Sequence, residues 1–321
     1  MIDKHSAAGY LQGKIGLCLL ISVMFAFGVC PLWAAPKDSP WGGDYFPNVE
    51  LTDQDGKKLK FYDDVIKDKV VAINFIYTHC GDSCPVETAN LKRVYALLAD
   101  RMGKDIFFYS ISIDPGHDTP KALKEYSKRF KIGSGWTFLT GKKEDTIILR
   151  QKLGLYNSEG EKQLSDHNTN FIIGNESTGQ WVKKTPYDEP MTLARALGYS
   201  LSKHKVMPGG KHPSYSQAKE LPNISKAEEV YRFRCSSCHS LGTDSGLGPG
   251  LYGVTMQRDR AWLKRWLKEP DKLLAEKDPI AIDLYNRYNK VLMPNLRLSD
   301  SDVEGLIDYL DSVAKPKEHR H

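Results

Sequence analysis

Two cysteines and a histidine form a compact motif in the last third of the chain. Cys235, Cys238 and His239 follow the pattern Cys-x-x-Cys-His. Two thiols at this spacing can form thioether bonds to the vinyl groups of a haem, and the adjacent histidine then binds the iron. The alternative is a redox dithiol, or half of a zinc site, followed by a chance histidine. Because residues farther along the chain also suit a haem protein, we predict a covalently attached c-type haem.

A second pair of cysteines stands where a strand is expected to lead into a helix. Cys80 and Cys84 follow a continuous apolar run at 70–77 and precede a helical pattern that begins at Val86. Backbone N–H groups and the positive end of the helix dipole favour thiolate at such a junction. Three residues separate these thiols, whereas thioredoxins have two. The pair can therefore form a structural disulfide, act catalytically in thiol–disulfide exchange, or direct both sulfurs at one metal ion.

The elements that would position these thiols alternate between strand and helix. We predict buried strands at 70–77 and 106–113, helices at 86–98, from Thr119-Pro120 onward, at 144–153 and at 191–201, and a hairpin at 169–183. Alternation of this kind, ending in a hairpin and a helix, indicates an α/β thioredoxin-like domain.

His167 is the candidate third ligand for a metal ion held by the two thiols. It stands just before the predicted hairpin, and in a thioredoxin-like fold this connection passes over the helix start that carries the cysteines. Two thiolates and one imidazole form a soft site of low coordination number, which suits Cu(I) and tolerates Cu(II). We expect His79 to tune the neighbouring thiol rather than to bind metal. No metal role is expected for His319 and His321 in the polar tail.

Several segments of this first domain resemble the SCO/SenC family of thioredoxin-like copper proteins, which serve copper-site assembly in cytochrome c oxidase. The resembling segments are Leu51 to Gly56, Tyr77 to Pro85, Ser112 to Pro115, Asp118-Thr119-Pro120 and Asp166-His167. The resemblance implies that Cys80, Cys84 and His167 bind copper, and that the partner is a copper-containing oxidase subunit. Gly81 departs from the family pattern, which usually has proline there, and this difference bears on copper affinity rather than on ligand identity.

The C-terminal region resembles a small class I cytochrome c, an all-α fold. The Gly-Pro-Gly-Leu run at 248–251 resembles the loop whose proline carbonyl accepts a hydrogen bond from the haem histidine. Met293 stands in a Met-Pro-Asn-Leu run, the usual setting of the distal methionine. The resemblance implies His239 and Met293 as the axial ligands of the iron. Met256 is the competing thioether, but it lies only a few residues past the Gly-Pro-Gly-Leu loop.

The chain is long enough for two domains joined by a linker. We predict an N-terminal signal or anchor segment at 1–40, the thioredoxin-like domain at 41–201, a linker at 202–224, the cytochrome c domain at 225–316 and a polar tail at 317–321. The linker is rich in Pro, Gly and polar residues without periodicity. The net charge of +5 is mild and comes largely from scattered lysines, so no nucleic-acid partner is expected.

An uncharged apolar run at 15–35 follows Lys4 and Lys14. It fits a cleaved signal peptide or a membrane anchor, since about 20 apolar residues span the hydrocarbon core. Haem is attached to Cys-x-x-Cys-His motifs outside the cytoplasm in bacteria. We therefore expect an exported chain on the periplasmic side, either anchored in the inner membrane or released after cleavage. Cys18 and Cys30 belong to this run and are expected to be plain apolar residues.

Three functions fit these features: a copper chaperone, a thiol–disulfide oxidoreductase acting on the cysteines of a partner copper site, and a plain electron carrier. A His/Met-ligated haem has a raised potential, whereas catalytic dithiols lie at about −120 to −270 mV. Reduction of a disulfide by such a haem would be uphill by on the order of 14 kcal/mol. Exchange of one electron with copper matches the haem better, so a redox-coupled copper chaperone with other electron-transfer partners is favoured.

Overall fold

The computed structural model describes residues 41–156, 159–202 and 223–314. The apolar run at 15–35, most of the predicted linker, and the tail with His319 and His321 lie outside these ranges. Within the described ranges, no helix is both long enough and apolar enough to cross a bilayer.

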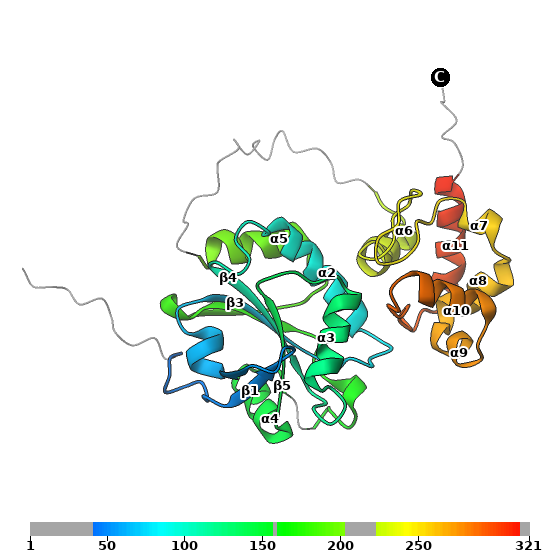
Figure 1. Ribbon diagram of the computed structural model, residues 1–321. Coiled ribbons are helices and arrows are strands. Elements are labelled where there is room, and N and C mark those ends of the chain that lie inside the picture. The colour runs from blue at the N-terminus through cyan, green and yellow to red at the C-terminus, as the bar shows by residue number, and fades with distance from the viewer. Residues whose placement is uncertain (1–40, 157–158, 203–222, 315–321) are drawn as a thin grey trace, which may run out of the picture. The chain divides into compact units, whose positions relative to one another are not determined.

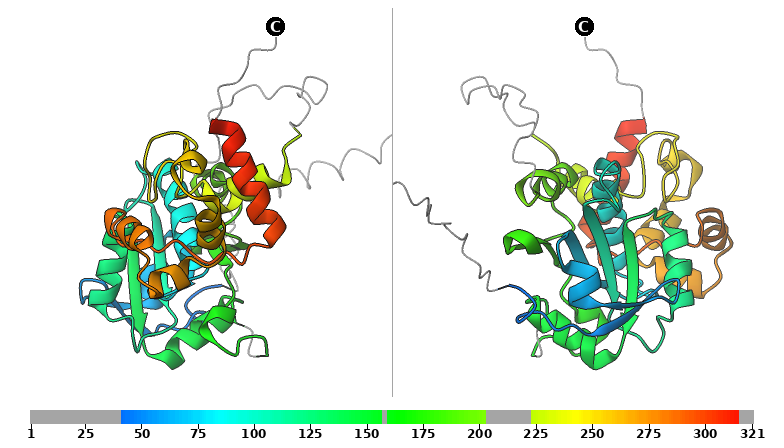
Figure 2. Two further views of the ribbon diagram at one scale, coloured as in Figure 1. Left: turned by 90° about the vertical axis from the view of Figure 1, so that its right-hand side faces the viewer. Right: turned by 60° about the vertical axis from the view of Figure 1, so that its left-hand side comes forward.

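A seven-stranded sheet forms the centre of the first part of the chain, in the order β2-β1-β5-β4-β3-β6-β7 (Figure 1). The strands are β1 (Glu50–Asp53), β2 (Lys58–Lys60), β3 (Val70–Ile76), β4 (Ile106–Ser112), β5 (Trp136–Gly141), β6 (Phe171–Asn175) and β7 (Gln180–Lys184). β3, β4 and β5 run parallel, and antiparallel strands extend the sheet on both sides. Every residue of β3 is buried. This burial follows from helices on both faces of the sheet (Figure 2).

Two of the helices of this part begin with a side-chain cap. The longer ones are α2 (Cys84–Leu97), α3 (Pro120–Arg129), α4 (Lys143–Lys152) and α5 (Pro190–Arg195), with short turns η1 (Phe61–Ile66), η2 (Leu164–Asp166), η3 (Glu176–Thr178) and η4 (Ala196–Ser200). Thr119 caps α3, since its hydroxyl accepts a hydrogen bond from the backbone N–H of Ala122 at 3.3 Å. α2 packs against α5.

The predicted fold class, a thioredoxin-like α/β domain followed by helices, is confirmed. The predicted buried strands correspond to β3 and β4, and the predicted hairpin to β6 and β7. Two details differ. The strands β1, β2 and β5 were not predicted, and the helix expected at 191–201 consists of α5 followed by the wider turn η4.

The C-terminal part of the chain is helical over its described residues. It contains α6 (Lys226–Val230), the turn η6 (Tyr231–Cys235), α7 (Val254–Gln257), α8 (Arg260–Lys268), α9 (Pro270–Ala275), α10 (Pro279–Arg287) and α11 (Asp300–Ala314), which is red in Figures 1 and 2. Ser299 caps α11 reciprocally with Asp302: its hydroxyl accepts from the N–H of Asp302, and the Asp302 carboxylate accepts from the N–H of Ser299. α11 packs against α6 and α8 around buried Leu306 and Ile307.

Candidate functional site

Cys80 and Cys84 lie at the junction between β3 and α2. β3 ends at Ile76, and Cys84 is the first residue of α2. The exposed fractions of Cys80 and Cys84 are 2% and 0%. Both are free thiols, and their side chains are hydrogen-bonded to each other. The structure therefore brings the two cysteines together at the carboxyl edge of the parallel strands.

The two thiols differ in acidity. The pKa of Cys80 is lowered to about 6, first by the hydrogen bond from Cys84 and further by hydrogen bonds from the Tyr77 hydroxyl and from backbone N–H groups of the loop. Burial raises the pKa of Cys84 well above its usual value. At neutral pH the pair thus consists of a Cys80 thiolate and a Cys84 thiol. The Cys84 S–H donates a hydrogen bond that stabilises the thiolate.

The carboxyl group of Glu87, which the sequence did not single out, lies on α2 close to the cysteines. Glu87 is one turn after Cys84 on α2 and is 1% exposed, and both carboxyl oxygens lack a hydrogen-bond partner. Burial raises the pKa of Glu87 to about 8. The group is therefore mainly protonated at pH 7, which avoids a second negative charge beside the Cys80 thiolate.

His167 presents a buried nitrogen without a partner. It follows η2, and its Nδ1 donates a hydrogen bond to the Leu164 carbonyl at 2.8 Å, which leaves Nε2 buried and without a hydrogen-bond partner. Burial lowers the pKa of His167, so the imidazole is neutral at pH 7. A neutral imidazole with one nitrogen oriented by a carbonyl and the other unpaired is the state that binds metal ions.

Tyr77 connects these ligand candidates. Its hydroxyl is hydrogen-bonded to Cys80, and its ring lies 5.7 Å from that of His167. However, the ligand atoms of Cys80, Cys84 and His167 do not all lie within 4.8 Å of one another in the part of the chain that the structure describes. Binding of one ion by all three residues would therefore require their ligand atoms to come closer together.

Position 81 imposes no steric demand for glycine. A Cβ placed on Gly81 would meet no atom within 4 Å, and its φ is not positive. The absence of proline therefore affects how freely the loop moves rather than how it packs.

A carboxylate behind the cysteine loop fixes its start. Asp118 is fully buried and accepts hydrogen bonds from the hydroxyls of Thr78 and Ser112, both at 2.6 Å, and from the backbone N–H of Thr78 at 3.1 Å. Since Thr78 follows β3 and Ser112 ends β4, this group ties the two strand ends together. In the sequence, Asp118 stands out only through the family resemblance, which implies no role for it.

The histidine of the haem-binding motif is oriented as the sequence predicted. The Nδ1 of His239 is 2.9 Å from the Pro249 carbonyl, to which it donates a hydrogen bond. A Cβ on Gly248 would lie 2.4 Å from the His239 ring, so only glycine fits against it. Burial lowers the pKa of His239, which keeps the imidazole neutral and its Nε2 available as a ligand.

A cavity of about 310 Å³ adjoins this histidine and is lined by Cys235, His239, Met293, many apolar side chains and a few polar ones, including Arg258 and Arg287. A smaller hollow of about 60 Å³ is lined by Cys238, His239 and Met293. Met256 lines neither cavity and is 73% exposed. His239 and Met293 line both cavities, Cys235 lines the larger one and Cys238 the smaller one. This donor set and the largely apolar lining fit a covalent haem.

Two family models match separate parts of this chain. The SCO1/SenC family model matches residues 38–197, and the cytochrome c model matches residues 224–314. The SCO1 protein homolog of Bacillus subtilis is 30% identical over 42% of this chain and 74% of its own length. The SCO2-like protein RC0895 of Rickettsia conorii is 39% identical over 44% of this chain and 67% of its own length.

The chain belongs to the SCO1/SenC family. It carries a C-terminal cytochrome c domain in addition. The structure of Bradyrhizobium japonicum ScoI with copper bound is similar, with 25% identity, coverage of 46% of this chain and 94% of that one, and a TM-score of 0.39. SCO1/SenC proteins are copper-binding proteins of cytochrome c oxidase assembly, and a cytochrome c domain implies haem.

The unequal acidity of the two thiols predicts selective alkylation. With limiting iodoacetamide, the rate of Cys80 modification should rise with pH and be half-maximal near the pKa of about 6, because only the thiolate attacks, while the 2% exposure of Cys80 keeps the absolute rate low. Cys84 should stay unmodified throughout this range, since burial raises its pKa. Peptide mass spectrometry after a pH series measures both rates, and Cys80→Ser serves as the control. Equal labelling of both cysteines at pH 6 would contradict the assignment.

The haem cavity predicts which thioether binds the iron. Met293→Ala should abolish the weak near-infrared absorption band that sulfur ligation gives to the ferric haem, whereas Met256→Ala should leave it unchanged. The matched pair differs only in which methionine is removed. Loss of the band in Met256→Ala alone would overturn the assignment of Met293.

Proposed function

We propose that this chain is a redox-coupled copper chaperone for a copper site of cytochrome c oxidase. It binds one copper ion, its cargo, through Cys80, Cys84 and His167. The observation that supports this best is the pairing of a low-pKa thiolate at Cys80 with a neutral, buried and unpartnered Nε2 at His167, both in contact with Tyr77. Two sulfurs and one imidazole suit Cu(I).

The cytochrome c domain would supply a one-electron centre. His239 and Met293 are the proposed axial ligands of the haem iron, and Cys235 and Cys238 its covalent attachments. The Pro249 carbonyl holds the ring of His239 in the orientation that ligation needs. One-electron exchange matches the Cu(I)/Cu(II) couple, whereas a dithiol would have to transfer two electrons.

A thiol–disulfide oxidoreductase is the second candidate. The asymmetry of the pair favours it, because an acidic Cys80 beside a buried, protonated Cys84 resembles an attacking thiol with its resolving partner. In that function Cys80 would attack a disulfide of a partner copper site, and Cys84 would then release the mixed disulfide. A plain electron carrier would need neither thiol.

We propose an exported protein on the periplasmic side, held at the inner membrane by residues 15–35 or released after cleavage. The covalent haem motif and the apolar run in the sequence support this location. The oxidase subunit that receives copper would meet the chain there.

Copper titration of the metal-free full chain tests the ligand set. Cys80→Ser or Cys84→Ser should each weaken Cu(I) binding by more than about 100-fold, because each removes a thiolate ligand. His167→Ala should mainly weaken Cu(II) binding, since Cu(II) prefers imidazole nitrogen more than Cu(I) does. Competition with a Cu(I) chelator measures the affinities. Met256→Ala is the control, because Met256 belongs to neither proposed ligand set. Wild-type Cu(I) affinity in the double cysteine variant would place the site elsewhere.

Stopped-flow spectroscopy tests the coupling of copper and haem. Addition of Cu(II) to the reduced, copper-free protein should oxidise the haem at a rate independent of protein concentration once copper is bound. The reason is that two tethered domains see each other at an effective concentration of roughly millimolar. The reaction should vanish in Cys80→Ser/Cys84→Ser. A rate that scales with protein concentration, or that persists without the cysteines, would favour the plain electron carrier.

A further inference from the structure

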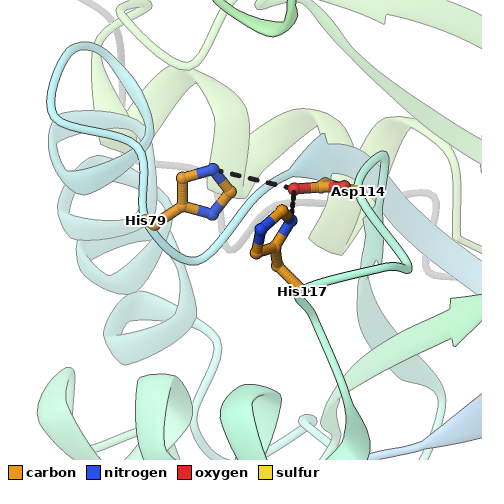
Figure 3. A group of neighbouring side chains, drawn as sticks. All are labelled: His79, Asp114 and His117. Carbon is orange, nitrogen blue, oxygen red and sulfur yellow. Dashed lines mark hydrogen bonds and ion pairs between the residues drawn. The ribbon is translucent and has the colours of Figure 1, made fainter.

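A second group of metal-ligating side chains lies beside the cysteine loop and plays no part in the proposed function. His79, Asp114 and His117 place their ligand atoms within 4.8 Å of one another (Figure 3). The Nε2 of His79 is 3.7 Å, and the Nδ1 of His117 is 2.7 Å, from the same carboxylate oxygen of Asp114. Tetrahedral coordination at 2.0–2.1 Å would separate neighbouring ligand atoms by about 3.3 Å, a value between these two.

Three residues from two loops meet here because the sheet and a buried carboxylate bring the loops together. β3 and β4 are parallel neighbours, so the segments after them leave the same edge of the sheet. Asp118 binds Thr78, the residue before His79, and itself directly follows His117. The Ser112 hydroxyl, which donates to Asp118, accepts a hydrogen bond from the N–H of Asp114 at 3.0 Å. The backbone on both sides of the cluster is thus held before any ion binds.

The cluster is open to solvent. The side chains of His79 and His117 are 50% and 75% exposed, and that of Asp114 is 18% exposed. An ion can therefore enter directly and keep a water molecule as a further ligand. An exposed ion pair of this kind contributes only about 0–1 kcal/mol to the free energy of unfolding. A gain in stability is therefore a weak explanation for two imidazoles that meet at one carboxylate.

We propose that His79, Asp114 and His117 form a second metal site, which binds one divalent transition-metal ion. Two imidazoles and one carboxylate suit Zn(II), Ni(II) and Cu(II), and the Irving–Williams order makes Cu(II) the tightest of these. The donor set contains no sulfur and differs in this respect from the thiolate pair at Cys80 and Cys84. This site does not depend on the proposed chaperone function.

The test uses full-length haem protein with the variant Cys80→Ser/Cys84→Ser/His167→Ala as background, so that the proposed chaperone ligands are absent. Titration with Cu(II) in the presence of glycine as a weak competitor, followed by electron paramagnetic resonance, should show one bound ion with hyperfine splitting from nitrogen. Adding His117→Ala or Asp114→Asn should weaken this binding by at least about 100-fold. The exposed His117 can be replaced without disturbing packing, and His79 is kept because it adjoins position 80.

Variants in the tail provide the matched control. His319→Ala/His321→Ala in the same background should leave the bound ion and its spectrum unchanged. Absence of a tightly bound ion in the background variant would overturn the proposal, as would binding that survives His117→Ala but is lost with the tail histidines. None of these results depends on Cu(I) binding by the thiols, so failure of this proposal and failure of the chaperone proposal are distinguishable.

Discussion

The buried carboxylate of Asp118 is the interaction on which the chemistry of the first domain depends. A fully buried charge is tolerated only when hydrogen bonds replace its hydration, and here two hydroxyls and one backbone N–H do so. These donors come from Thr78 and Ser112, so the carboxylate fixes both strand ends at once. Loss of the group would leave buried donors unpaired, at a cost of about 1–3 kcal/mol for each. The loops that carry the ligand candidates therefore start from a fixed frame.

Burial then makes two chemically identical thiols different. Cys80 accepts hydrogen bonds from Cys84, from Tyr77 and from loop N–H groups, which together outweigh its own desolvation. Cys84 has no comparable compensation and keeps its proton. Glu87, desolvated below them, stays mainly neutral at pH 7 and so adds little repulsion to the Cys80 thiolate. One negative charge, rather than three, is thus placed at the start of α2, where backbone N–H groups and the helix dipole favour it.

The sequence was sufficient for features set by local pattern and insufficient for those set by tertiary contact. The apolar run of β3, the start of α3 at Thr119-Pro120 and the Pro249 carbonyl opposite His239 were predicted and are present. β1, β2 and β5 escaped prediction because two are only 3 and 4 residues long and the third mixes polar and apolar residues. Glu87 reads as a surface residue of a helix, and only the packing of the domain shows that it is buried.

The metal-ligand candidates show the same limit most clearly. Cys80 and Cys84 are close in sequence, and their spacing alone predicted that they meet. His79 and His117 are 38 residues apart, and only the parallel pairing of β3 with β4 brings them to one carboxylate. The result is two donor sets at one edge of the sheet: buried sulfur, which suits Cu(I), and exposed imidazole with carboxylate, which suits divalent ions. An ion would lose more hydration on entering the buried set than on entering the exposed one, so binding at the proposed copper site would depend on the sulfur donors and on the thiolate charge.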